Sequence, residues 1–169
     1  MATIGHIAAG IAIARAGTGG RDYLGLVVVT AAAVSPDIDL VFGMNHRGAT
    51  HSVGFAVVVA VASGVLLRTA DHPRPRHIAL LAFLSVLSHI LLDFLTVASP
   101  IAALWPITST EFRFPYPFLP SIPLDERIQS VAGMRTAAAE VAWSIGLVAA
   151  GMWIGFRHRG VGTGGTEAS

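Results

Sequence analysis

Five apolar segments, separated by polar stretches, constrain the fold of this chain more than any other feature. They cover roughly residues 3–15, 22–42, 52–68, 77–98 and 137–157. A helix needs about 20 apolar residues to cross the hydrocarbon core of a bilayer. The second, fourth and fifth segments reach that length, the third nearly does, and the first is short enough for a half-span or a tilted helix packed inside the bundle. The pattern predicts an all-α, polytopic membrane helix bundle with four to five membrane segments.

The composition agrees with a membrane protein. The chain is 53% hydrophobic and 12% charged, whereas soluble domains carry about 25% charged residues. It has no cysteine, which excludes disulfides and thiolate metal sites. A net charge of +1 gives no broad electrostatic field for nucleic acid, so no nucleic-acid partner is expected. The expected partner of so apolar a chain is membrane lipid, and the sequence does not identify protein partners.

The length suits a single integral membrane domain, residues 1–158, followed by a flexible tail at 159–169. Between the fourth and fifth segments lies one long extracytoplasmic loop, at about 99–136.

The arginines predict how the segments are oriented. If the chain crosses at each segment, one side receives seven arginines and two aspartates: Arg15, Arg21, Arg68, Arg74, Arg76, Arg157, Arg159, Asp22 and Asp71. The positive-inside rule assigns that side to the cytoplasm. The chain is then a multi-pass protein of the cell inner (cytoplasmic) membrane, with its N-terminus outside and its C-terminus inside.

In this orientation, almost every unusual polar residue falls at the outer ends of the segments. Seven of them can bind a metal: His6, Asp37, Asp39, His46, His51, His89 and Asp93. Histidine and carboxylate are good zinc ligands, and a site without cysteine also suits Mn, Fe or Mg. The set is large enough for one or two divalent ions on the extracytoplasmic side, with zinc as the first expectation.

Two of these residues lie in "LSHILLDFLT". His89 and Asp93 are four apart, so they share one face of a helix. An ionisable side chain that faces lipid costs several kcal/mol by most estimates, so both are expected to point inward. The alternative to metal binding is a buried hydrogen bond that ties two helices together.

The stretch "VSPDIDLVFGMNHRGATHS", residues 34–52, holds most of the others. Pro36 predicts a kink or a new helix start before Asp37 and Asp39. The alternative to metal binding for these two aspartates is a surface loop in which both are solvated. Gly48 permits a turn that brings His46 and His51 inward. Arg47 offers a planar fork for phosphate or carboxylate. Thr50 or Ser52 is expected to cap the following helix.

These motifs resemble a known family. "GH" near the N-terminus, "PDID", "HRGATHS", "LSHILLDFLT" and "LWP" occur in this order over roughly residues 3 to 120. Together they are similar to the YdjM-like family of membrane-bound metal-dependent hydrolases, also described as LexA-binding and inner membrane-associated. The resemblance implies functional roles for His6, Asp37, Asp39, His46, Arg47, Thr50, His51, Ser52, His89 and Asp93.

Two features set limits on this resemblance. Family members often have an acidic or histidine-containing run after the second aspartate, where this chain has "LVFG". One ligand fewer is therefore expected. No element of the sequence resembles a LexA-docking segment.

The segment at 99–136 combines prolines with aromatic residues, including "LWPITSTEFRFPYPFLP". Proline at this density prevents a regular helix, and aromatic rings favour the headgroup level. The segment is either a loop on the bilayer surface or a lid whose Trp105 and Arg113 contact a substrate. Glu140, near the start of the fifth segment, is either solvated at the interface or a metal ligand or catalytic base.

The function expected from these residues is hydrolysis at the extracytoplasmic face. A metal-activated water would cleave an ester or phosphoester of a lipid or lipid-linked substrate. Asp39, Arg47 and Glu140 are the expected catalytic groups, and substrate contacts are expected from Arg47, Thr50, Ser52, Trp105 and Arg113. The alternatives are a metal ion or proton transporter, and a non-enzymatic membrane regulatory protein with a structural metal site.

Overall fold

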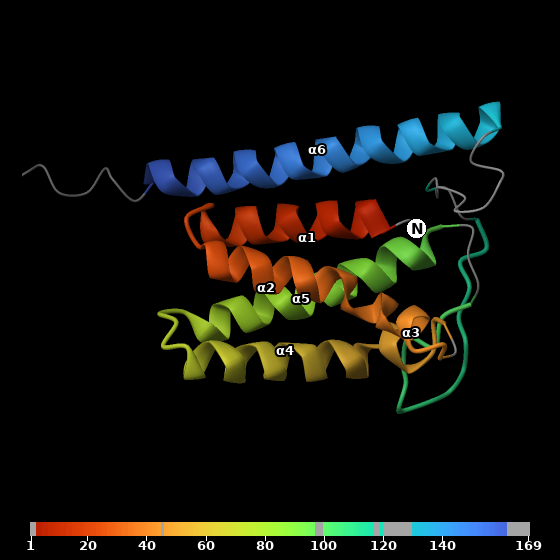
Figure 1. Cartoon of the computed structure of the whole chain (residues 1–169), viewed down its shortest axis with the longest axis horizontal. Helices are drawn as coiled ribbons and strands as arrows, with labels where there is room; N and C mark the ends of the chain where they lie inside the picture. The colour runs from red at the N-terminus through yellow and green to blue at the C-terminus, as the bar shows by residue number, and fades with distance from the viewer. Residues whose placement is uncertain (1–2, 45, 97–99, 117–118, 120–129, 162–169) are drawn as a thin grey trace, which may run out of the picture.

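The computed structural model describes residues 3–44, 46–96, 100–116, 119 and 130–161. These residues form the long helices α1 (Thr3–Thr18), α2 (Tyr23–Val34), α4 (Val53–Thr69), α5 (Pro75–Phe94) and α6 (Val131–Val161). Short elements connect α2 to α4: the 3-10 turn η1 (Ser35–Asp37), the helix α3 (Ile38–Val41) and the 3-10 turn η2 (Ala49–His51). The predicted all-α bundle is confirmed (Figure 1).

Three helical stretches are long and apolar enough to cross a membrane: Tyr23–Val41, Pro75–Phe94 and Val131–Arg157. The helix α4 is apolar but shorter. The three long stretches correspond to the second, fourth and fifth apolar segments of the sequence, and α4 corresponds to the third. Their relative lengths agree with the prediction from the sequence.

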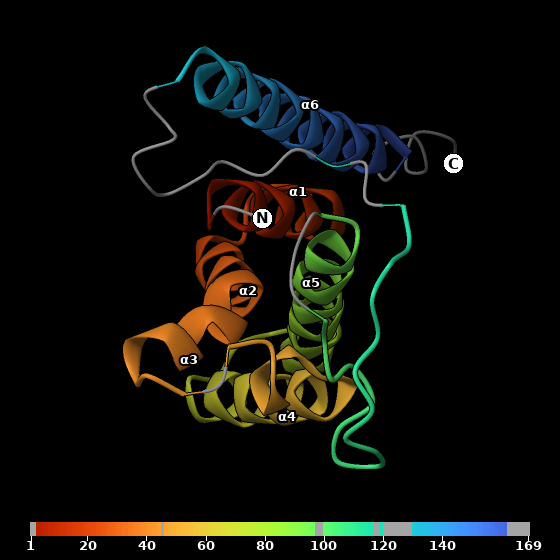
Figure 2. The ribbon, with the colours of Figure 1, turned by 90° about the vertical axis from the view of Figure 1, so that its right-hand side faces the viewer.

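The short first segment forms α1, which lies inside the bundle. It is flanked by α6 on one side and by α2 and α5 on the other (Figure 2). Ala8, Ala9 and Ala14 are buried along it. The internal position explains why this helix needs neither the length nor the continuous apolar surface of a lipid-exposed span.

Small residues let α1 approach its neighbours closely. A Cβ atom added to Gly10 would lie 2.7 Å from the Ala33 Cβ on α2. On α6, side chains at Gly151 and Gly155 would overlap the backbone of Ala12 and Arg15. Since apolar side chains gain little by leaving lipid, such close backbone contact is a main source of helix association in membranes.

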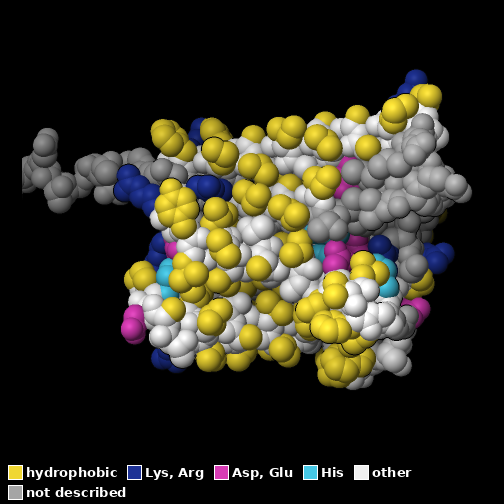
Figure 3. All heavy atoms as spheres, in the orientation of Figure 1, with side chains coloured by type: hydrophobic (Ala, Val, Ile, Leu, Met, Phe, Trp, Pro, Cys, Tyr) yellow, Lys and Arg dark blue, Asp and Glu magenta, His cyan; other side chains and the backbone are white. Residues whose placement is uncertain are grey.

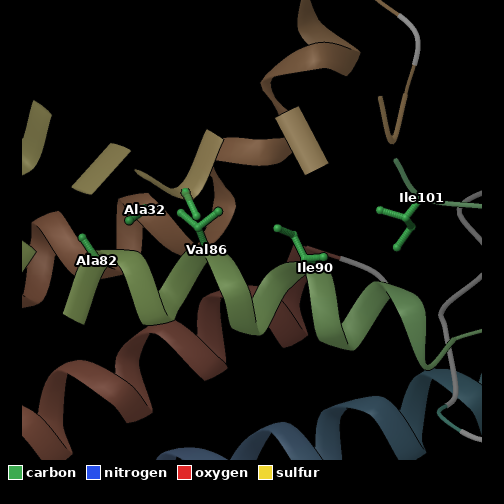
Figure 4. Packing of buried hydrophobic residues seen from close by; sticks show 6 residues of the cluster. Ala32, Ala82, Val86, Ile90 and Ile101 are labelled. Carbon is green, nitrogen blue, oxygen red and sulfur yellow. The ribbon is translucent and has the colours of Figure 1, made fainter. Parts of the chain in front are cut away.

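The main apolar core joins α2, α4 and α5. Ala32, Ala82, Val86 and Ile90 pack together, and Ile101 from the segment after α5 closes the cluster (Figure 4). Ile101 also pairs with Phe112 through two backbone hydrogen bonds of 2.9 Å. The beginning of the long loop is therefore part of the core, which holds this loop against the end of α5.

The break predicted at Pro36 is confirmed. The helix α2 ends at Val34, and η1 and α3 follow in sequence. Gly43, with φ of +61°, then reverses the chain, and the Met44 amide donates to the Asp39 carbonyl at 2.9 Å. A positive φ of this size favours glycine.

The C-terminal helix α6 begins earlier than the apolar pattern suggested. Its first turn is capped by the Ser130 hydroxyl, which accepts from the Gly133 amide at 3.0 Å. The connection expected at 99–136 therefore ends at Ser130, and its residues 97–99, 117–118 and 120–129 lie outside the described residues. The helix continues to Val161, and the rest of the expected tail, 162–169, is also outside them.

Candidate metal centre

Polar side chains gather at one end of the bundle, and Figure 1 shows the position of this end by the label α3. They come from segments far apart in the sequence: His6 from α1, Asp37 from η1, Asp39 from α3, His46 and Arg47 from the loop, Thr50 and His51 from η2, and His89 and Asp93 from α5. Acidic and histidine side chains are visible together beside α3 in Figure 3. The seven residues proposed from the sequence as metal ligands are thus brought to one place.

Four ligand atoms of this cluster, two imidazole nitrogens and two carboxylate oxygens, lie close together. The Nε2 atoms of His51 and His89 are 3.2 Å apart. Oδ1 of Asp37 lies 3.8 Å from His51 Nε2 and 3.5 Å from His89 Nε2. Oδ2 of Asp93 lies 3.6 Å and 4.0 Å from the same two nitrogens. We call these four residues the His–Asp cage.

Five of the distances between cage atoms can be compared with those around a tetrahedral ion. Zinc bound at about 2.0–2.1 Å by four ligands has ligand atoms about 3.3 Å apart. The five distances above range from 3.2 to 4.0 Å. Two imidazoles and two carboxylates also supply the nitrogen and oxygen donors that zinc accepts.

The outer nitrogens of both imidazoles have partners that fix the tautomer. Nδ1 of His89 lies 2.7 Å from the Ala33 carbonyl, so it must donate. The Thr50 hydroxyl donates to Asp39 Oδ2 at 2.8 Å, which leaves its oxygen to accept from His51 Nδ1 at 3.2 Å. Both Nε2 lone pairs therefore face the cage centre. Two lone pairs at this separation repel each other, and a cation between them removes the repulsion.

The protonation of His51 agrees with this assignment. Burial lowers the pKa of its imidazole, and the nearby Asp93 carboxylate raises it only in part. The ring is therefore neutral at pH 7, which is the form that binds metal.

Asp39 lies behind His51 and does not belong to the cage. Its carboxylate is 2.9 Å from His46 Nδ1 and 3.2 Å from the Arg47 amide, in addition to the Thr50 contact. Its Oδ2 is also 3.3 Å from His51 Nδ1. Such a carboxylate orients two histidines, an arrangement that typically raises the basicity of a ligating imidazole.

Arg47 connects the loop to the cage. Its Nη2 donates to Asp93 Oδ2 at 3.1 Å. The Arg47 carbonyl accepts from the Ala102 amide at 3.2 Å, which links the loop to the segment after α5. Its φ is +68°, whereas Gly48 has φ of −81°. The turn expected at Gly48 is thus made by Arg47, a non-glycine residue in the left-handed region, where strain is common at functional sites.

Two further histidines flank the cage. The ring of His6 stacks on His89 with centroids 3.6 Å apart, and its Nε2 lies 3.3 Å from Asp93 Oδ1. Neither of its ring nitrogens has hydrogen-bond geometry to a described partner, although the side chain is buried. His46 meets the edge of His51 with centroids 5.0 Å apart.

The flanking histidines allow a second arrangement with two ions. His6, His89 and Asp93 form one group of potential ligand atoms within 4.8 Å of one another, and Asp37, His46 and His51 form another. One ion between the lone pairs of His51 and His89, or one ion in each of these two groups, is compatible with the positions of the ligand atoms.

The other sequence-predicted residues have different positions. The Ser52 hydroxyl caps α4 by accepting from the Phe55 amide at 3.1 Å, as expected for one of the two hydroxyl residues. Glu140 is fully buried on α6. Trp105 and Arg113 are exposed, and within the described part of the chain no hydrogen bond or ion pair joins their side chains to the cage.

Sequence reasoning did not find the backbone groups that complete the site. The Ala33 carbonyl orients His89, and the Ala103 carbonyl accepts from the Val53 amide at 2.9 Å. Gly54 allows the same loop segment to lie against the start of α4, since a Cβ there would lie 2.7 Å from the Trp105 carbonyl oxygen. The alanine contacts leave no side-chain signal in a single sequence.

The comparisons with known proteins identify the family. The family model of the YdjM inner membrane protein matches residues 1–161. No curated protein and no solved structure matches the chain. The chain therefore belongs to the YdjM inner membrane protein family, as the motifs suggested.

Proposed function

We propose that this protein is a membrane-embedded, metal-dependent hydrolase that cleaves an ester or phosphoester of a lipid or lipid-linked substrate. The observation that carries the proposal is the His–Asp cage, in which two oriented imidazole nitrogens and two carboxylate oxygens converge. Hydrogen bonds that only tied helices together would pair each nitrogen with its own partner. Two imidazole nitrogens that both present lone pairs 3.2 Å apart, with two carboxylate oxygens beside them, are typical of a cation site.

The cage residues would hold a divalent ion, most simply zinc, with Mn, Fe or Mg as alternatives. Such an ion would lower the pKa of a water molecule and polarise the bond under attack. Asp39 and Thr50 keep His51 in the tautomer that presents Nε2.

His46 is well placed to act as a general base. Its Nδ1 lies 2.9 Å from Asp39 Oδ1, which leaves Nε2 as the basic nitrogen. Its side chain is 34% exposed, whereas those of His51 and His89 are buried. His46 accepts the proton of the attacking water at Nε2, and Asp39 stabilises the resulting imidazolium. In this proposal Asp39, which the sequence predicted as a catalytic group, acts by orienting His46 and stabilising its charge.

Arg47 provides a fixed positive charge beside the cage. Its guanidinium contacts Asp93 Oδ2, and its planar donors suit the oxygens of a phosphoester or carboxylate. An anionic headgroup is therefore preferred over a neutral one. Glu140 is buried on α6 and stays a second candidate for proton transfer.

Apolar surface near the cage supports a substrate taken from the bilayer. Val41 at the end of α3 is 80% exposed, and Ile107 in the loop is 90% exposed. Exposed aliphatic side chains at this end favour contact with the apolar part of the bilayer over contact with water. The arginine-rich opposite end supports placing the cage on the extracytoplasmic side.

The test uses detergent-purified protein loaded with zinc and a panel of lipid phosphoesters and carboxyl esters. We expect His46→Gln to lose turnover by about 100-fold or more while it retains metal, as for loss of a general base. His89→Ala should lose both metal and turnover. His77→Gln, at the opposite end, is the matched control and should retain both. A metal-loaded, folded protein that cleaves no member of the panel would overturn the proposal.

The two alternative functions predict different results. A transporter would show metal or proton flux in proteoliposomes that depends on His89. If the metal site were only structural, His89→Ala would unfold the protein, and neither the wild type nor any variant would cleave a substrate.

A further inference from the structure

A groove lies between α4 and α5, at the end of the bundle opposite to the cage. It has a volume of about 430 Å³ and is lined almost entirely by apolar side chains. Ala60 and Gly64 on α4 and Ala79 on α5 make it concave, because a Cβ at Gly64 would already lie 3.3 Å from the Ala79 Cβ. Phe83 closes its inner end, toward the middle of the bundle.

Two arginines stand at the outer end of this groove. Arg68 lies in the last turn of α4 and Arg76 in the first turn of α5, and both line the groove and are exposed. Neither forms an ion pair with any residue in the described ranges. Their neighbour Arg74 differs, since its Nη2 lies 3.7 Å from Asp22 Oδ2.

The charge around the mouth of the groove is positive. Arg68, Arg74 and Arg76 are opposed by Asp22 and by Asp71 in the turn between the two helices. Asp22 is engaged with His72 at 3.1 Å and with Arg74 at 3.7 Å, and among the described residues neither Asp22 nor Asp71 pairs with Arg68 or Arg76. Three arginines against two aspartates leave a net positive charge at the mouth. An anion is the complement that the surface itself requires.

The depth of the groove matches one leaflet. From Arg68 to Ala60 the helix rises about 12 Å, while half of the hydrocarbon core is about 15 Å. An occupant with its charge at the arginines would therefore have an apolar part running along the groove toward the bilayer middle.

We propose that this groove binds an anionic phospholipid of the leaflet at the arginine-rich end. Its phosphate contacts Arg68 and Arg76, and one acyl chain lies along Ala60, Gly64 and Ala79 toward Phe83. Basic pockets between membrane helices bind anionic headgroups through the same combination of charge and apolar surface. This site is independent of the cage and of the proposed hydrolase activity.

The experiment measures binding of phosphatidylglycerol and of phosphatidylcholine with identical acyl chains, by native mass spectrometry of the whole protein. We expect phosphatidylglycerol to bind more tightly. Arg68→Gln and Arg76→Gln should each weaken its binding about five-fold, since one arginine near an anionic surface contributes about 1 kcal/mol. Arg135→Gln, an exposed arginine at the cage end of α6, is the matched control and should change nothing.

A second variant tests the acyl chain. Ala60→Leu fills the groove without changing its charge, and it should also weaken binding of phosphatidylglycerol. The proposal is overturned if the two lipids bind equally, or if the arginine variants bind phosphatidylglycerol as the wild type does. Unchanged binding by Ala60→Leu would overturn the placement of the acyl chain in the groove.

Discussion

Histidines at the two ends of the bundle have different surroundings. At the basic end, His72 Nε2 donates to Asp22 at 3.1 Å and its Nδ1 accepts from the Arg74 amide at 3.2 Å. His77 Nε2 donates to the Gly17 carbonyl at 2.9 Å. At the other end, Nε2 of His51 and Nε2 of His89 face each other and two carboxylates.

The difference separates two uses of a buried histidine. Where each nitrogen has one donor or acceptor as its partner, the ring ties two segments together and needs nothing else. Where two imidazole acceptors face each other, as at His51 and His89, no donor between them is seen among the described residues, and we propose that a cation takes that place. Residue type alone does not distinguish the two ends, because both contain histidine and aspartate.

The largest expected effect concerns the buried carboxylates. Asp39→Ala should lower the free energy of unfolding by about 3 kcal/mol, because it leaves the Thr50 hydroxyl and the Arg47 amide without their acceptor. Asp22→Ala leaves the Gly25 amide and His72 Nε2 without their acceptor, but both hydrogen bonds are only partly buried, so the loss should be about 1 kcal/mol. Denaturation in mild detergent measures both. Equal losses would remove the contrast between the two ends.

The contact between α1 and α6 should contribute to stability and not to the cage. Gly151→Leu is expected to destabilise the fold by about 3 kcal/mol, since the side chain would overlap the Ala12 backbone. Gly146→Leu is the control, because a Cβ there meets nothing within 4 Å. The cage takes no ligand from α6, so the folded Gly151→Leu protein should still bind metal. Loss of metal from that folded protein would place part of the site on α6.

The hydroxyl behind His51 should affect metal affinity without supplying a ligand. Thr50→Val removes the oxygen that orients His51 Nδ1 and is expected to weaken zinc binding about 10- to 100-fold. Thr50→Ser keeps the hydroxyl and should bind nearly as the wild type does. Competition with a chelator of known affinity measures the difference. If the two variants bind zinc alike, the hydroxyl does not orient His51.

The smallest expected effect is a pH dependence at the basic end. Burial opposes ionisation of Asp22, but hydrogen bonds from the Gly25 amide and His72 outweigh it, so its pKa lies below the usual value of 3.8. A lowered folded-state pKa gives stability that is present above pH 3.8 and is lost as pH falls through the folded-state value. Thermal denaturation should show this loss between about pH 5 and about pH 3, roughly one unit above and below an ordinary aspartate pKa. In Asp22→Asn the loss should be smaller.

Much of the fold was accessible from the sequence. The apolar segments predicted the helices, and Pro36 predicted the break before α3. The internal position of α1 was one of two interpretations of its short length. The start of α6 was not found, because the Ser130 cap lies in a stretch with few strongly apolar residues.

The site could be predicted only in part for a physical reason. The residue types of His51, His89 and Asp93 named the candidate ligands, since ionisable groups in membrane segments are expensive to bury. The separation of Asp37 in the cage from Asp39 behind His51 depends on how η1 and α3 turn the chain. That turn, and the left-handed Arg47, follow from tertiary contacts with α5 and with Ala102.

The most direct test of the cage is elemental analysis of the detergent-purified protein beside a folded His51→Ala variant. We predict about one zinc ion per chain in the wild type, as a four-ligand site allows, and its loss in the variant. His72→Ala, which removes a histidine paired with Asp22 at the opposite end of the bundle, should keep the full amount of zinc. A folded wild type that holds no metal after incubation with zinc, manganese or magnesium would show that the cage is not a metal site.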